Sequence, residues 1–124
     1  MFYRLCAEMT VSARTQRGQR AELQAVAYLE AQGLYCVARN WRCPLGELDI
    51  VMRDGEVVVF VEVRARATRR FGGAAESITP TKQRRLERAA AWYLQGLDGV
   101  PPCRFDAVLL EGDEAPIWLK NIFG

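Results

Sequence analysis

Histidine is missing from the 124 residues of this chain, and cysteine is scarce. Without histidine, the usual Ser-His-Asp and Cys-His catalytic arrangements are excluded. The cysteines show no C-x-x-C spacing, so we expect no zinc site; they are Cys6, Cys36, Cys43 and Cys103. Hydrolysis by such a chain would have to be assisted by a metal ion of another kind.

Long hydrophobic runs are also missing. No stretch approaches the roughly 20 apolar residues that span a bilayer, and the first ten residues, MFYRLCAEMT, lack the apolar segment of a signal peptide. We therefore expect a cytoplasmic protein with reduced thiols and with no nucleotide cofactor. The length fits one domain, predicted over residues 16–124, after a loosely ordered N-terminal extension at residues 1–15.

The net charge is only +2, but the basic residues are unevenly distributed. Positions 64 to 88 carry a net charge of +6, which leaves −4 for the remainder. Eight basic side chains make up this segment: Arg64, Arg66, Arg69, Arg70, Lys82, Arg84, Arg85 and Arg88. Arginine forks suit phosphate oxygens, so the segment is a candidate nucleic-acid surface. A solvated helix face and loop is the alternative interpretation.

A β-hairpin is predicted between Gly46 and Arg66, where Asp54-Gly55 separates two runs rich in valine and isoleucine. With Asp-Gly as the central pair of the turn, Arg53 would pair with Glu56. In that register Asp49 lies opposite Phe60, and Glu47 lies opposite Glu62. Opposed residues share a face of the sheet. One face would therefore carry three carboxylates and an arginine among apolar residues: Glu47, Asp49, Glu62 and Arg64 with Val51, Val58 and Phe60.

Carboxylates on a covered face are costly. Unit charges roughly 6 Å apart at an effective dielectric constant of about 20 repel by about 3 kcal/mol per pair. Arg64 would offset only part of this repulsion. The site would respond by raising a carboxylate pKa, by turning one acid to solvent, or by holding a divalent cation such as Mg²⁺.

The other elements predict a mixed α/β (α+β) fold. An apolar stripe indicates a helix from about Arg17 to Gln32, with Glu22 on the stripe near its N-terminus. A first strand is expected at Leu34–Trp41. Thr79-Pro80 indicates the cap and first turn of a second helix, with Lys82 in that turn. Strands at Cys103–Leu110 and Ile117–Leu119 complete an αβββαβ order with a short extra C-terminal strand.

This order of elements and acids resembles the PD-(D/E)XK nuclease superfamily, with its restriction-endonuclease-like and Holliday-junction-resolvase-like fold. The chain looks most like the uncharacterised bacterial YraN family over roughly residues 17–123. Several motifs in order carry the resemblance: AELQAVAYLEAQG, RNWR, GELDIV, FVEVRAR, FGGAAESIT and RFDAV. Several ordered motifs at suitable separations make a stronger match than an isolated D…ExK pattern.

The resemblance implies hydrolysis of phosphodiester bonds with Mg²⁺ or Mn²⁺. Its pattern places the helix glutamate on Glu22, the strand aspartate on Asp49, and the E-x-K element on residues 62–64. Those three acids would hold the metal, and Glu47 would act from a neighbouring position. Nucleic acid, DNA above all, is the implied partner, and a homodimer is conceivable by analogy with resolvase-like relatives. No membrane association is expected.

Three positions depart from the superfamily pattern. Leu48 stands before the aspartate in place of proline, and Ala21 stands where a glycine precedes the helix glutamate. Arg64 replaces lysine, and an arginine with a pKa above about 12 stays a cation, so it can clamp phosphate but cannot serve as a base. Either the metal acts alone, or Lys82 reaches the site, or hydrolysis has been lost.

These alternatives define competing functions. The first is a metal-dependent, structure-selective endonuclease acting on branched or flapped DNA. The second is a catalytically inactive nucleic-acid-binding or adaptor protein on the nuclease fold, which would bind with a salt-dependent affinity and without divalent metal. The third, a role in protein assembly, has no residue that argues for it directly.

Overall fold

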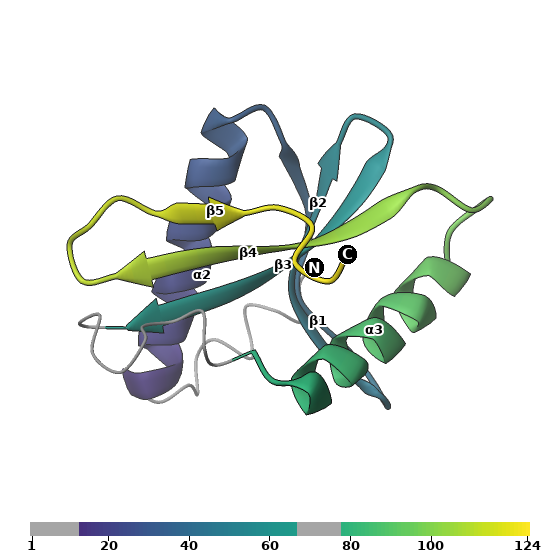
Figure 1. Cartoon of the computed structure of the whole chain (residues 1–124), viewed down its shortest axis with the longest axis horizontal. Coiled ribbons are helices and arrows are strands. Elements are labelled where there is room, and N and C mark those ends of the chain that lie inside the picture. Colours follow the sequence, from purple (N-terminus) through teal and green to yellow (C-terminus); the bar gives the residue numbers. More distant parts are fainter. Residues whose placement is uncertain (1–12, 67–77) are drawn as a thin grey trace.

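A computed structural model of the chain describes residues 13–66 and 78–124 (Figure 1). Its elements follow one another as α2 (Ala13–Ala31), β1 (Tyr35–Cys43), β2 (Gly46–Asp54), β3 (Val57–Arg66), α3 (Pro80–Gln95), β4 (Cys103–Glu111) and β5 (Ile117–Leu119). Within these ranges, no helix is long and apolar enough to cross a membrane.

The sheet has five strands in the order β1-β2-β3-β4-β5. All neighbouring strands are antiparallel except β3 and β4, which are parallel. A parallel pair needs a crossover connection, and α3 lies within the segment that makes it. The predicted mixed α/β fold, an αβββαβ core with a short extra C-terminal strand, is therefore confirmed.

The two helices pack against separate apolar clusters of the sheet. Residues of β2 and β3 alternate between the clusters, as the two-residue period of a strand requires. Ile50 and Val59 pack with Leu29 of α2, whereas Val58 packs with Leu86 of α3. The buried acids of the hairpin therefore have to be accommodated between two apolar layers.

The predicted register of the hairpin is wrong by two residues. Asp54 pairs with Val57, and Arg53 pairs with Val58 rather than Glu56. The loop is Gly55-Glu56, with Gly55 at a φ of 62°. This is the pattern of a type II′ turn, which places glycine at the first central position, whereas the prediction used Asp-Gly as the central pair. A shift of two residues does not by itself turn a side chain to the other face of the sheet.

Several element boundaries also differ from the prediction. Helix α2 begins at Ala13, four residues before the predicted start and inside the predicted N-terminal extension; residues 1–12 lie outside the described ranges. Strand β1 continues to Cys43, two residues beyond the predicted end, because its end pairs with the start of β2. The start of α3 agrees with the sequence: Thr79 is the N-cap, and its Oγ1 accepts a hydrogen bond from the backbone N of Lys82 at 3.2 Å.

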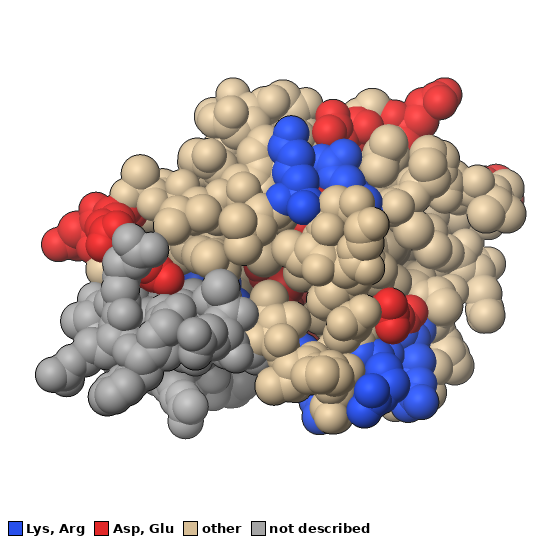
Figure 2. Space-filling view, viewed as in Figure 1, with Lys and Arg blue, Asp and Glu red and all other residues tan. Residues whose placement is uncertain are grey.

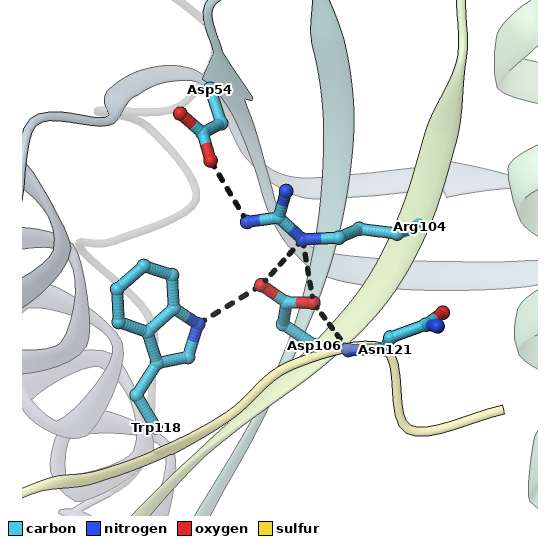
Figure 3. Close-up of polar contacts among 5 residues, drawn as sticks. All are labelled: Asp54, Arg104, Asp106, Trp118 and Asn121. Carbon is cyan, nitrogen blue, oxygen red and sulfur yellow. Dashed lines mark hydrogen bonds and ion pairs between the residues drawn. The ribbon is translucent and has the colours of Figure 1, made fainter. Parts of the chain in front are cut away.

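A buried aspartate ties the C-terminal segment to the sheet (Figure 3). Asp106 of β4 is fully buried. Its carboxylate accepts hydrogen bonds from Arg104 Nε at 3.0 and 3.1 Å, from Trp118 Nε1 at 2.9 Å and from the backbone N of Asn121 at 2.9 Å. Arg104 also bonds Asp54 at 3.1 Å. The sequence did not single out this network, which joins β2, β4, β5 and the residues after β5.

Candidate active site

The candidate site lies where strands β2 and β3 part. Their backbone pairing ends at Ile50 and Val61. Toward its start, β2 pairs with β1, and toward its end, β3 pairs with β4. Asp49 occupies the point of separation, and its Oδ2 accepts a hydrogen bond from the backbone N of Val63 at 3.1 Å. The side chain thus satisfies a donor on β3 that strand pairing leaves available.

The alternation of side chains along β2 is interrupted at the same point. Leu48 packs in the apolar cluster against α3, whereas Ile50 packs in the cluster against α2. In a regular strand, residues two apart would share a face. The irregularity allows Asp49 to reach sideways toward β3 instead of pointing into either apolar layer.

Glu62 is the most buried acid of the site, with 4% of its surface exposed. Arg64 Nη2 lies 2.8 Å from its Oε2, and Lys82 Nζ lies 3.0 Å from the same oxygen. Lys82 comes from the first turn of α3, which Thr79 and Pro80 position. The structure therefore places two cations of different chemistry, a planar guanidinium and a primary ammonium, on one carboxylate.

Asp49 and Glu62 form a hydrogen-bonded carboxylate pair. Burial, this hydrogen bond and the charge of Glu62 raise the pKa of Asp49 from 3.8 to about 7, against the opposing effects of the Val63 N–H and Lys82. Two carboxylates in contact cannot both ionise at low cost. Two of the responses expected from the sequence are therefore present: the pKa of Asp49 is raised, and Glu47 is turned to solvent.

Glu22 approaches the site from α2. Burial and the negative charge of Asp49 raise its pKa from 4.5 to about 7, while a hydrogen bond to Asn40 and the charge of Arg39 act in the opposite direction. Its Oε1 is buried and, within the described part of the chain, has no hydrogen-bond partner. Asn40 holds a left-handed backbone with φ of 53°, a conformation that asparagine tolerates better than most residues. The sequence flagged the RNWR motif but not the contact of Asn40 with Glu22.

The donor chemistry of these carboxylates fits a hard divalent cation, which prefers oxygen ligands. Asp49 and Glu62 are already in contact, and Glu22 offers a buried oxygen without a partner. Nowhere in residues 13–66 and 78–124, however, do three Asp, Glu, Cys or His side chains gather closely enough to hold a metal ion as they stand. Glu22 would complete a three-carboxylate set only after its side chain reorients.

Glu47 lies apart from the buried pair. It is exposed, and its Oε2 lies 3.2 Å from Arg42 Nε. Its charge still contributes to the raised pKa of Glu22. Glu47 and Arg42 line a hollow of about 320 Å³ between α3 and the turn that joins β1 to β2, together with Lys82 and Arg85. The sequence predicted that Glu47 lies beside the metal-binding acids, whereas the structure places it in a surface ion pair with Arg42.

Basic side chains gather over helix α3 (Figure 2). Three of the predicted nucleic-acid-binding residues are exposed there: Arg84, Arg85 and Arg88. The side chain of Arg66, at the end of β3, lies outside the described part of the chain, as do Arg69 and Arg70. Helix α3 thus brings Lys82 into contact with Glu62 of the carboxylate pair and presents a basic surface beside it.

A very small cavity separates the site from the buried network of Asp106. Its volume is about 10 Å³, close to that of one water molecule. Its walls include Asp49 and Glu62 as well as Asp106. Two acidic centres are therefore close neighbours across β3, although the sequence identified only one of them.

Comparison with known proteins finds close relatives. Residues 21–110 match the profile of the uncharacterised protein family UPF0102. The chain is 54% identical over 113 residues to a UPF0102 protein of Cupriavidus metallidurans, covering 90% of this chain and 84% of the relative. It is 52% identical over 121 residues to a UPF0102 protein of Pseudomonas putida (93% and 98%) and 49% identical over 113 residues to one of Nitrosomonas eutropha (91% and 97%).

Proposed function

Given that this chain belongs to the uncharacterised protein family UPF0102, we propose a function from the chemistry of its site: metal-dependent hydrolysis of phosphodiester bonds in nucleic acid, DNA in the first place. The observation that carries the proposal is the contact of Asp49 with Glu62 where β2 and β3 part, beside Lys82 and an arginine-rich helix. The resemblance to the PD-(D/E)XK superfamily agrees with it.

The metal would be Mg²⁺ or Mn²⁺, held by Asp49 and Glu62 and completed by Glu22. When bound, such an ion supplies Lewis-acid stabilisation of charge on a phosphodiester and a nucleophile at neutral pH. Carboxylates with pKa values near 7 are partly protonated at neutral pH, and a cation that binds them would displace these protons. Metal affinity should therefore increase as the pH rises through 7.

Lys82 and Arg64 divide the work that one lysine performs in the superfamily pattern. Arg64 remains a cation and is suited to hold a phosphate oxygen in its fork. Lys82 carries an ammonium on a flexible stem, the type of group that can give up a proton near a metal site. Because both cations lie within 3.0 Å of the same oxygen of Glu62, a phosphate or a metal would reorganise them together.

A nucleic-acid-binding protein without hydrolysis is the second candidate. One observation favours it: the innermost acid, Glu62, is already compensated by two cations. A carboxylate held in this way competes less well for a metal ion. In that case the arginines of α3 would bind phosphates with a strong salt dependence, whether or not divalent metal is present.

The test incubates the full chain with Mg²⁺ or Mn²⁺ and single-stranded, flapped and four-way DNA. We expect cleavage of at least one substrate, its loss in Asp49→Asn, and a decrease of about 100-fold or more in Lys82→Gln, the usual range for an acid or base residue. Asp113→Asn makes the same substitution as the first variant at an exposed turn residue and should leave the rate unchanged.

The outcomes separate the two candidates. Cleavage that persists in Asp49→Asn would come from a contaminant and would remove the support for an enzyme. Salt-dependent binding that ignores divalent metal, with no cleavage of any substrate, would favour the binding protein. Absence of affinity for nucleic acid at about 50 mM salt would contradict both.

A further inference from the structure

Aromatic side chains line a second hollow at the far end of helix α3. Its volume is about 490 Å³, and its walls are Trp41, Trp92, Tyr93, Gln95, Gly96 and Leu97. Tyr93 is fixed by edge-to-face contacts with Trp41 at 5.3 Å and with Phe60 at 5.9 Å between ring centroids. Trp92, unlike the packed ring of Tyr93, is open to solvent, with 43% of its surface exposed. A large indole is thus presented to solvent on a rigid aromatic wall.

The aromatic hollow and the basic hollow lie along the same helix. Arg85 and Trp92 are seven residues apart, close to two turns, so their side chains project from the same side of α3. Trp41 and Arg42 are neighbours on β1 and line the aromatic and the basic hollow, respectively. Lys82 and Trp92 are ten residues apart, which corresponds to about 15 Å along the helix. That length matches about four nucleotides of a stacked strand.

The charges of the basic hollow suit a polyanion. Lys82, Arg42 and Arg85 line it, against a single carboxylate from Glu47. The ion pair between Arg42 and Glu47 is exposed on both sides. Because exposed ion pairs are weak, phosphate oxygens can compete for Arg42 with little loss.

We propose that the surface between α3 and β1 binds a single-stranded segment of nucleic acid, with phosphates at Arg42 and Arg85 and an unpaired base stacked on Trp92. This rests on the proposed function and specifies its substrate class. An aromatic face can stack only on a base that is out of a duplex, which is how sequence-tolerant single-strand binding operates. The strand would run from the carboxylate pair, beside Lys82, to the indole.

The test measures binding of fluorescently labelled DNA in EDTA, where no cleavage can occur. The probes are oligothymidylate, a strand of equal length whose central residues lack bases, and a duplex. The variants are Trp92→Ala and Trp92→Phe, with Tyr35→Ala as the matched control. Tyr35 is an exposed aromatic at the opposite end of β1 and lines neither hollow.

We expect Trp92→Ala to weaken binding of oligothymidylate about tenfold, in the range found for the loss of one stacked base. The base-lacking strand and the duplex should bind this variant as well as they bind the unmodified protein. Trp92→Phe should keep most of the affinity because phenylalanine retains a stacking face. Arg85→Ala should instead weaken all three probes and reduce the dependence of log affinity on log salt by about one.

The proposal is overturned if Trp92→Ala and Tyr35→Ala bind oligothymidylate equally, or if the loss extends equally to the base-lacking strand. Neither result would touch the proposed nuclease activity, which is measured separately with divalent metal and Asp49→Asn. Conversely, binding that depends on Trp92 without any cleavage would support the single-strand surface and count against the enzyme.

Discussion

Asp106 on β4 and Asp49 on β2 are separated in the sheet only by β3, and their surroundings differ in one respect that matters. Asp106 is fully buried, and both of its oxygens accept hydrogen bonds from Arg104 and from groups near the C-terminus. Asp49 accepts one backbone hydrogen bond and shares another with Glu62, a second acid. Burial raises its pKa to about 7.

The difference distinguishes an acid that holds the fold from an acid that is available for chemistry. A buried charge with complete hydrogen bonding contributes to a defined structure, and removing one partner is costly. A buried acid with an acidic neighbour destabilises the fold and titrates near neutral pH, which is typical of functional sites. The contrast supports the assignment of the candidate site to Asp49 and Glu62 and of a structural role to Asp106.

The largest effect on stability is expected from Asp106→Ala. This substitution leaves Arg104 half-buried without its main partner and removes the acceptor for Trp118 and for the backbone of Asn121. Breaking a buried ion pair costs about 3–5 kcal/mol. Urea unfolding should show that loss in the free energy of unfolding. A loss below about 1 kcal/mol would mean that the network does not hold the C-terminal segment, and Asp113→Asn provides an exposed control.

Asp49→Asn is expected to increase the free energy of unfolding, whereas Asp106→Ala decreases it. The pKa of Asp49 is higher in the folded state than its ordinary value of 3.8, so the unfolded chain ionises first as the pH rises and the folded state loses stability. Asparagine cannot ionise, and its amide can donate to Glu62. The variant should match the unmodified protein near pH 4 and become more stable between about pH 4 and 7, by at most about 4 kcal/mol.

The measurement is the difference in free energy of unfolding between the two proteins across this pH range. Glu22→Gln, which likewise replaces an acid by its amide, should increase the free energy of unfolding by less because Glu22 is only half-buried. A difference that is constant with pH, or that favours the unmodified protein at pH 8, would show that Asp49 is an ordinary ionised carboxylate.

The sequence predicted local features well and long-range polar contacts poorly. Alternation along β3 was enough to place Glu62 and Arg64 on one face, and a register error of two residues did not change this because the period of a strand is two. Alternation along β2 did not predict the interruption between Leu48 and Ile50, which lets Asp49 reach toward β3. The Thr79-Pro80 cap and its helix followed from local chemistry. These features depend on residues that are close in sequence.

The network of Asp106 shows what could not be predicted. Arg104 and Asp106 look like ordinary residues of a strand, and their partners lie up to 50 residues away, at Asp54, Trp118 and Asn121. No periodicity connects such positions, since only the packed sheet brings them together. The contact of Asn40 with Glu22 was missed for the same reason. Lys82 could be predicted as a candidate residue of the site only because the start of its helix was predicted from Thr79-Pro80.

The smallest effect on stability is expected for Trp118→Phe. This variant tests whether each hydrogen-bond donor to Asp106 contributes to the free energy of unfolding. The variant keeps a ring against the apolar cluster of α2 but removes the Nε1 donor that lies 2.9 Å from Asp106 Oδ2. Hydrogen bonds to charged groups contribute about 1.5–3 kcal/mol. Urea unfolding followed by circular dichroism should show a loss in that range, with Trp92→Phe as the control at an exposed indole. An unchanged stability would mean that Arg104 and the backbone of Asn121 already satisfy the carboxylate of Asp106, and that the contrast with Asp49 depends on Arg104 in place of the acidic neighbour Glu62.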